Sequence, residues 1–207
     1  MVISIYGGSG SGKTTLATAL QQYFFNDGRG CYLLSGDDYP HRIPKRNDEE
    51  QLRVYKEAGE DGLRGYLGTK KEIDFARINE VLAAFHEGKD TITLRHLERE
   101  DGEISSEETD FSGTSVLLLE WTHGGSDDLH GVDLSVFLES SPEETKERRI
   151  RRNRDENAAS PFICRVVELE QEKLEVQRKN AGCIFFFLHS AEPVPFRSRP
   201  GIFRDRL

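Results

Sequence analysis

Cysteine is scarce in this chain of 207 residues. The three cysteines, Cys31, Cys164 and Cys183, are far apart in the sequence and show neither C-x-x-C nor metal-ligand spacing. This pattern argues against a disulfide framework and against a cysteine-based metal site. We expect three reduced thiols that are buried as small apolar side chains.

Long apolar runs are also missing. No segment approaches the roughly 20 apolar residues that are needed to cross a bilayer. The first expected strand begins at Val2, which leaves no space for a secretory signal sequence. The sequence therefore predicts a cytoplasmic protein with no membrane partner.

Basic charge and aromatic residues are both in short supply. The net charge is -9 and aromatic residues make up 9% of the chain. Because phosphate-backbone binding needs a broad basic surface, we expect no nucleic-acid partner. The length fits one well-packed domain over residues 1–207, and oligomerisation is left open.

One motif is complete. Residues 7–14 read G-G-S-G-S-G-K-T, which matches G-x-x-x-x-G-K-[ST], the loop that binds the phosphates of a nucleoside triphosphate such as ATP. An apolar run, Val2–Tyr6, precedes it, and helical spacing of Leu16, Leu20 and Phe24 follows it. The nucleotide-binding candidates are Gly8, Ser9, Gly10, Ser11, Gly12, Lys13, Thr14 and Thr15.

Within this loop, Lys13 is expected to reach the β- and γ-phosphates, and the Thr14 hydroxyl to bind Mg²⁺. A dinucleotide motif fails, because Lys13 or Thr15 stands where the third glycine of G-x-G-x-x-G is required. The alternative is a glycine-rich turn that matches the pattern by chance.

Short apolar runs alternate with helical patterns, which is typical of an α/β fold with a parallel sheet and helices on both faces. The candidate strands are Val2–Tyr6, Cys31–Leu34, Thr91–Leu94, Ser115–Leu119, Leu134–Leu138 and Cys183–Leu188.

Three helices have clear signals. Apolar spacing between Ile78 and Phe85 predicts a helix that ends near Gly88. Ser141-Pro142 and Ser160-Pro161 are start signals, and the second opens a charged, exposed helix that runs to Gln177. The final stretch, 193–207, is a docked or disordered tail.

Acidic residues follow two of the expected strands. Asp37 and Asp38 come after the second strand, and Glu120 comes after the apolar run Val116–Leu119. Ligands of open parallel sheets bind beyond these strand ends. One carboxylate could accept the proton of an acceptor hydroxyl, and Glu120 could hold Mg²⁺. The alternatives are a solvated turn or helix cap for the aspartates and a structural ion pair for Glu120.

A basic segment, residues 146–155, stands out against the acidic whole. Arginines bind phosphate through two parallel hydrogen bonds, which suits a lid over about 146–160 with at least one arginine on ATP. Its alternative is an exposed helix balanced by nearby glutamates, and Asn153-Arg154-Asp155 could equally serve an interior ion-pair network.

Further candidates lie beside the strand ends. His41, Arg42 and His123 could contact the acceptor, although a lone histidine such as His123 often only packs or hydrogen-bonds locally. Trp121 is more typical of a core or pocket wall than of a base-stacking platform.

The chain resembles the uridine kinase and phosphoribulokinase family in four segments. These are the phosphate-binding loop, Gly36-Asp37-Asp38-Tyr39 with His41-Arg42, the segment 119–124 and the arginine-rich stretch. That resemblance implies a P-loop kinase fold, ATP with Mg²⁺, and transfer of phosphate to a hydroxyl of a small metabolite. It implies Asp37 rather than Asp38 as the general base, and Glu120 as a magnesium ligand. The lid residues that it implies are Arg151, Arg154 and Asp155, with Arg151 on ATP and Arg154 in catalysis. Asp38, Tyr39, His41, Arg42 and His123 are the acceptor-site candidates.

Two departures from the family concern the acceptor: Trp121 replaces a usual glycine, and Pro40 follows Tyr39. The acceptor is left open among a nucleoside, a sugar or sugar phosphate, and a pantothenate-like compound, and Arg42, Lys45 and Arg46 hint at an anion. The alternative functions are an adenylylsulfate kinase and a nucleotide-dependent regulatory NTPase.

Overall fold

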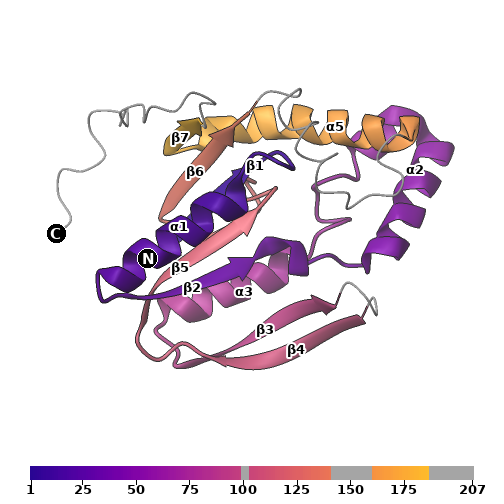
Figure 1. The fold of residues 1–207 in the computed structure, drawn as a ribbon. Coiled ribbons are helices and arrows are strands. Elements are labelled where there is room, and N and C mark those ends of the chain that lie inside the picture. The colour runs from indigo at the N-terminus through magenta and orange to yellow at the C-terminus, as the bar shows by residue number, and fades with distance from the viewer. Residues whose placement is uncertain (99–102, 141–159, 187–207) are drawn as a thin grey trace.

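The computed structural model describes residues 1–98, 103–140 and 160–186. Its centre is a five-stranded parallel sheet in the order β2-β5-β1-β6-β7 (Figure 1). The strands are β1 (Val2–Gly7), β2 (Gly30–Ser35), β5 (Thr114–Trp121), β6 (Leu134–Glu139) and β7 (Cys183–Phe186). The predicted α/β fold with a parallel sheet is therefore confirmed.

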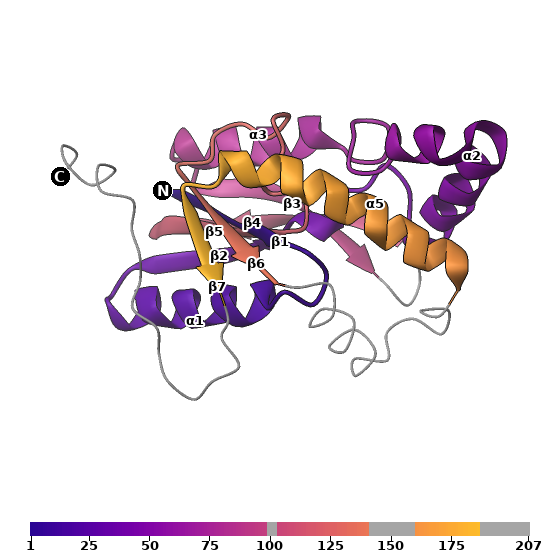
Figure 2. The ribbon, with the colours of Figure 1, turned by 90° about the horizontal axis from the view of Figure 1, so that it is seen from above.

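Helices cover both faces of this sheet (Figure 2). On one face, α1 (Lys13–Asn26) packs through Ala17 and Phe24 on side chains such as Ile5 and Leu118. On the other face lie α3 (Phe75–His86) and α5 (Pro161–Gln177). The central strands are buried on both sides, which explains their continuous apolar sequence.

One predicted strand belongs to a different sheet. Thr91–Leu94 lies in β3 (Thr91–Glu98), which pairs antiparallel with β4 (Glu103–Asp110) in a separate two-stranded sheet. The prediction of a strand is correct, but its place among the parallel strands is wrong. β4 was missed because its sequence, EISSEETD, is polar and almost wholly exposed, so it lacks the alternation that marks a half-buried strand.

Two helices differ from expectation. α2 (Pro44–Arg64) was not predicted, because it is highly charged and is interrupted at Gly59, whose φ of 64° is outside the helical region. α5 begins at Pro161 as predicted, but it is not simply exposed. Val166 and Leu169 are buried against Leu63, Tyr66 and Leu67 of α2 and the turn that follows it.

The cysteines form no disulfide, as expected, but they are not buried. Cys31 and Cys183 are partly exposed and Cys164 is exposed. Among the described residues, no helix is both long and apolar enough to span a membrane. The predicted helix start at residue 141, most of the lid and the tail 193–207 fall outside the described residues.

Candidate active site

The phosphate-binding loop connects β1 to α1. Gly12, at φ 99°, immediately precedes the first helical residue, Lys13. A Cβ on Gly7 would lie 2.5 Å from the Leu138 carbonyl oxygen, so glycine lets β1 end close against β6. The Lys13 ammonium donates to the carbonyl oxygens of Gly7 and Gly8 at 3.0 Å each. Its side chain therefore folds back over the loop at the helix N-terminus, where phosphates bind in such loops.

The two predicted magnesium ligands lie together. Thr14 Oγ1 donates a 2.9 Å hydrogen bond to Glu120 Oε1. Glu120 lies near the carboxyl end of β5, opposite Ile5 of β1 and Ser35 of β2. A hydroxyl and a carboxylate are both oxygen donors of the kind that Mg²⁺ prefers, so this pair fits the ion chemically.

The paired aspartates form a short 3₁₀ turn, η1 (Gly36–Asp38), directly after β2. They have different neighbours. Asp37 is exposed and interacts electrostatically with His123, whereas Asp38 interacts with Tyr32 and Tyr39. Asp37 therefore faces the same strand ends as Glu120. Asp38 faces the side of the molecule where the two-stranded sheet of β3 and β4 packs.

Gly36 explains how the chain accommodates its unusual tryptophan. A Cβ at Gly36 would clash with the ring of Trp121, which is 3% exposed in the core shared with α3. The absence of a side chain at Gly36 therefore lets η1 lie directly on the indole. Trp121 is a wall of the core here, as its sequence context suggested.

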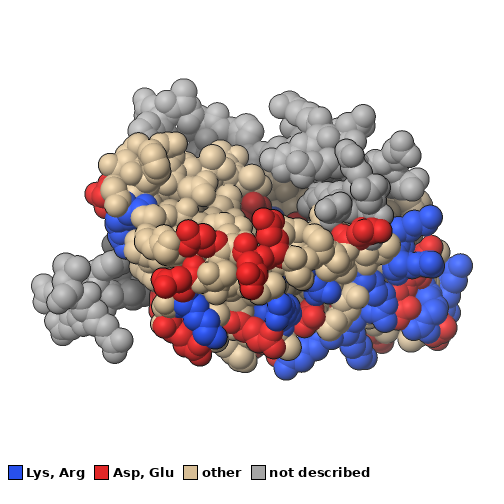
Figure 3. Space-filling view, turned by 90° about the horizontal axis from the view of Figure 1, so that it is seen from below, with Lys and Arg blue, Asp and Glu red and all other residues tan. Residues whose placement is uncertain are grey.

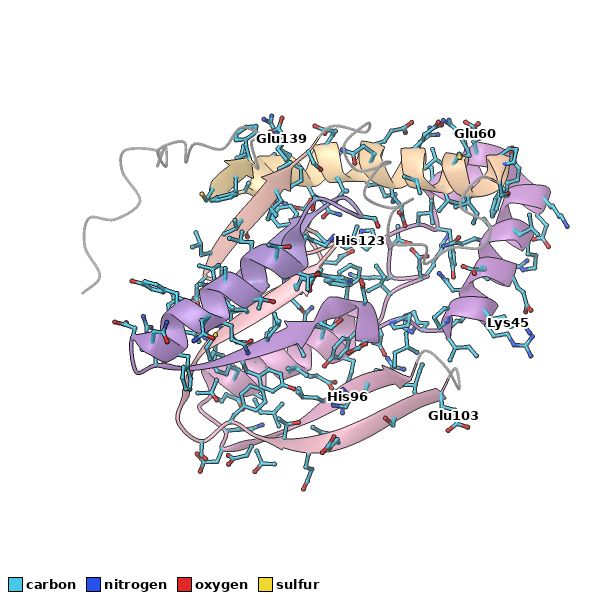
Figure 4. All side chains as sticks on the ribbon, in the orientation of Figure 1. Lys45, Glu60, His96, Glu103, His123 and Glu139 are labelled. Carbon is cyan, nitrogen blue, oxygen red and sulfur yellow. The ribbon has the colours of Figure 1, made fainter. Side chains whose placement is uncertain are left out.

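His123 lies in the interior, below α5 in the view of Figure 4. It is 6% exposed, and its Nδ1 atom has no hydrogen-bond partner among the described residues. Burial lowers its pKa below the usual value of 6.5. Glu72 and Asp37 oppose that shift, and Lys173 and Lys13 reinforce it. The lowered pKa favours the neutral ring, and its Nδ1 has no partner within the described part of the chain although charges of both signs lie nearby.

Three other candidates for the acceptor site are already engaged. Tyr39 is fully buried in the core beside α3, and burial raises its pKa to about 12. Arg42 donates to the Lys71 carbonyl at 3.2 Å and lies 3.6 Å from Glu50. The His41 ring is 3.0 Å from the Lys70 carbonyl oxygen. The structure thus brings Lys13, Thr14, Asp37, Glu120 and His123 together, and it does not turn the Tyr39 side chain toward them.

Sequence patterns missed a buried carboxylate, Glu72, which is 6% exposed. Its Oε1 accepts from Asn47 and Gln51 of α2 at 2.8 Å each, and its Oε2 accepts from the Gly68 backbone N–H at 2.6 Å. Glu72 therefore holds the turn at 66–73 against α2. A Cβ on Gly68 would lie 2.7 Å from His123 Cε1, so this turn also confines the imidazole.

The signal that could have pointed to Glu72 is weak, because a single glutamate after two lysines looks like an ordinary surface residue.

Arg151, Arg154 and Asp155 of the expected lid lie outside the described residues. The remaining loop positions, Ser9 and Thr15, are exposed, and Ser11 is buried.

Comparisons with known proteins identify a family and similar folds. The model of the phosphoribulokinase / uridine kinase family matches residues 2–160. The chain is 91% identical, over 184 residues or 89% of its length, to the bifunctional alpha-galactosidase/sucrose kinase of Mediterraneibacter gnavus. It spans only 20% of that relative's length.

Two solved structures show the same fold at low identity. Phosphoribulokinase from Rhodobacter spheroides superposes with a TM-score of 0.67 at 17% identity, covering 89% of this chain and 69% of that one. A possible uridine kinase from Bacillus stearothermophilus gives a TM-score of 0.62 at 20% identity, covering 89% and 88% of the two chains.

Proposed function

This chain belongs to the phosphoribulokinase and uridine kinase family, and we propose that it is an ATP-dependent kinase whose acceptor is a neutral sugar, with sucrose as the first candidate. One observation carries the phosphotransferase part of this proposal. The Thr14–Glu120 hydrogen bond puts the end of the phosphate-binding loop within reach of a strand-end carboxylate, at the edge that Asp37 also faces. The proposed donor and acceptor sites would thereby be adjacent, as ligands at strand ends of parallel sheets are.

On the donor side, Lys13 and the loop N–H groups would hold the β- and γ-phosphates of ATP. Thr14 and Glu120 would hold Mg²⁺, which when bound neutralises charge on the phosphates. Arg151 remains the proposed lid contact to ATP, and Arg154 the proposed catalytic arginine of the lid. Positioning and charge stabilisation by these residues would supply most of the rate enhancement.

On the acceptor side, Asp37 would accept the proton of the attacking hydroxyl as the bond from its oxygen to the γ-phosphorus forms and the bond from that phosphorus to the bridging oxygen breaks, which releases ADP. Its exposed position and its electrostatic interaction with His123 support this role over the same role for Asp38. His123, neutral and with an unsatisfied Nδ1, would orient the acceptor hydroxyl.

The described arginines on the acceptor side are already paired with carboxylates, which supports a neutral acceptor. Arg42 is 3.6 Å from Glu50, and Arg95 is 3.3 Å from Asp74. The face seen from below carries interspersed acidic and basic side chains, with most Lys and Arg toward the α2 end (Figure 3). Arg46 and Arg53 of α2 pair there with glutamates of the same helix. Arginines that already neutralise carboxylates are poorly placed to bind a sugar phosphate.

The name of the Mediterraneibacter gnavus relative includes a sucrose kinase, and the chain matches 20% of that protein. Sucrose is therefore the first acceptor to test. We further propose that residues 1–207 form one kinase domain. A cytoplasmic location, where ATP is available, completes the proposal.

An acceptor screen tests this function. Mg²⁺-dependent ADP release would be measured with sucrose, glucose, fructose, ribulose 5-phosphate, uridine, pantothenate and adenylylsulfate. Sucrose should give the highest kcat/KM, and mass spectrometry should find one phosphate added to it. A preference for ribulose 5-phosphate or uridine would overturn the neutral-sugar assignment. ATP hydrolysis that responds to no acceptor would favour the regulatory NTPase instead.

A further inference from the structure

Lys173 is a lysine on α5 that the proposed chemistry does not yet use. It is only partly exposed, and among the described residues no carboxylate lies within 4.0 Å of its ammonium and no hydrogen bond engages it. A half-buried ammonium with no close carboxylate in the described part of the chain is costly, and a methionine or leucine would pack there at lower cost. Such a residue is a candidate for ligand binding.

The position of Lys173 on the helix indicates which face of α5 carries its side chain. Val166 and Leu169 precede it by seven and four residues, so all three share one face of α5. Val166 and Leu169 pack on Leu63, Tyr66 and Leu67. Lys173 therefore continues this stripe toward the turn at 66–73, the turn that Glu72 fastens to α2.

Neighbouring positions on α5 face elsewhere. The Gln171 side chain lies beside Gly8 of the phosphate-binding loop, where a Cβ on the glycine would be 3.2 Å from Gln171 Oε1. Two residues along a helix correspond to a rotation of about 200°. The side of α5 that touches the loop is therefore not the side that carries Lys173.

The charged neighbours connect Lys173 to the candidate site. Lys173 interacts with Glu72 and Arg64, which belong to α2 and the turn after it. His123 interacts both with Glu72 and Lys173 and with Lys13 and Asp37. The imidazole is thus near the proposed reacting groups, Lys13 and Asp37, and also near a second pair of charges, Glu72 and Lys173.

We propose that Lys173 is a specificity-determining residue of the acceptor site, where its ammonium donates hydrogen bonds to sugar oxygens remote from the reacting hydroxyl. This inference rests on the proposed sugar kinase function. Glu72 already accepts three hydrogen bonds from α2 and the turn, so its part is to position the turn and to balance the charge of Lys173. A disaccharide has two rings, so one ring could present its hydroxyl to Asp37 while oxygens of the other accept from Lys173, whereas a monosaccharide has a single ring.

The test compares Lys173→Met with the wild-type chain, using ATP with sucrose, glucose or fructose. The KM for sucrose should rise about 10- to 100-fold, as expected for a lost hydrogen bond to a charged donor, while kcat and the KM for ATP change less than about threefold. The preference for sucrose over the two monosaccharides should shrink by a similar factor. Lys173→Arg, which keeps donors, should retain most of the sucrose affinity.

The matched control is Lys179→Met, at a side chain that is 60% exposed just after α5. This variant should leave kcat, the KM for sucrose and the KM for ATP unchanged. The melting temperature of each variant would be measured first, and Lys173→Gln would replace Lys173→Met if the latter did not fold. An unchanged KM for sucrose would overturn the role of Lys173 alone. A fall in kcat at constant KM would assign the ammonium to the transferring phosphate instead. A wild-type chain that phosphorylates no sugar would overturn the proposed function and this inference together.

Discussion

Thr14 of α1 and Glu120 of β5 are joined by a 2.9 Å hydrogen bond, although 106 residues separate them in the chain. The contact exists because β1 and β5 are parallel neighbours in the sheet, with Ile5 opposite Glu120. The loop after β1 and the last residues of β5 therefore meet at the same edge. Each prediction below depends on groups at that edge.

Glu120→Gln should weaken Mg²⁺ binding. The amide keeps the size of the side chain and can still accept from Thr14, but it removes the negative charge that would attract the ion. We expect the Mg²⁺ concentration for half-maximal activity to rise by about tenfold or more and kcat to fall by at least about tenfold. An ADP-release assay over a MgCl₂ titration measures both. Glu107→Gln, at a 75% exposed side chain on the hairpin, should match the wild type. An unchanged Mg²⁺ dependence in Glu120→Gln would remove this residue from the metal site.

Asp37→Asn should lower kcat by roughly 10²- to 10⁴-fold, because the amide cannot accept the hydroxyl proton. ATP affinity, measured by titration with a fluorescent nucleotide, should stay close to the wild-type value. Asp38→Asn serves as the neighbouring control and should have the smaller effect on kcat. The reverse ranking of the two variants would make Asp38 the base.

Gly36→Ala should destabilise the fold by about 1–3 kcal/mol, since the new methyl group would clash with the Trp121 ring and force η1 or the indole to move. Urea denaturation measures the loss, and kcat should fall as Asp37 shifts with the turn. In a Trp121→Gly background the space is open, so the same alanine should cost much less. Equal costs in the two backgrounds would mean that the indole does not set the position of η1.

His123 should make stability depend on pH in the acidic range. Burial lowers its pKa in the folded state, so below about pH 6.5 the unfolded chain binds a proton that the folded chain refuses. The free energy of unfolding should therefore fall as the pH drops from 6.5 toward the folded pKa, and the contribution is fully present above 6.5.

Urea denaturation at pH 7.5, 6.5 and 5.5 tests this pH dependence. His123→Asn should flatten the acidic decline, whereas His96→Asn, at a ring that is 40% exposed, should leave it unchanged. A decline of the same steepness in all three proteins would assign it to other groups.

Much of the site was readable from the chain because its signals are local. The loop at 7–14 carries its own turn chemistry, and its flanking strand and helix have the expected apolar spacing, so the roles of Lys13 and Thr14 could be predicted directly. Asp37 and Glu120 follow buried apolar runs, and the rule that ligands bind at the carboxyl ends of parallel strands brought them to one edge. The order of the strands was not needed for that step.

Other features depend on contacts that no local pattern records. Glu72 looks like a surface glutamate until α2 brings Asn47 and Gln51 to it, and α2 itself escaped prediction because its few apolar residues and Gly59 weaken the helical period. β4 is polar and becomes a strand only by pairing with β3. Tyr39 looked like an acceptor contact beside the aspartates, yet it is buried under α3.

The sequence by itself determined the phosphate-binding loop, the parallel α/β fold and the candidate carboxylates, because backbone conformation in a glycine-rich turn and burial of apolar runs are short-range consequences of residue type. Only the tertiary structure decided which aspartate faces His123, which arginines are already paired, and that Lys173 lies toward the turn held by Glu72. Those outcomes depend on the free energy of contacts between segments far apart in the chain. Such contacts cannot be read from local residue patterns, because they form only when the sheet and helices pack.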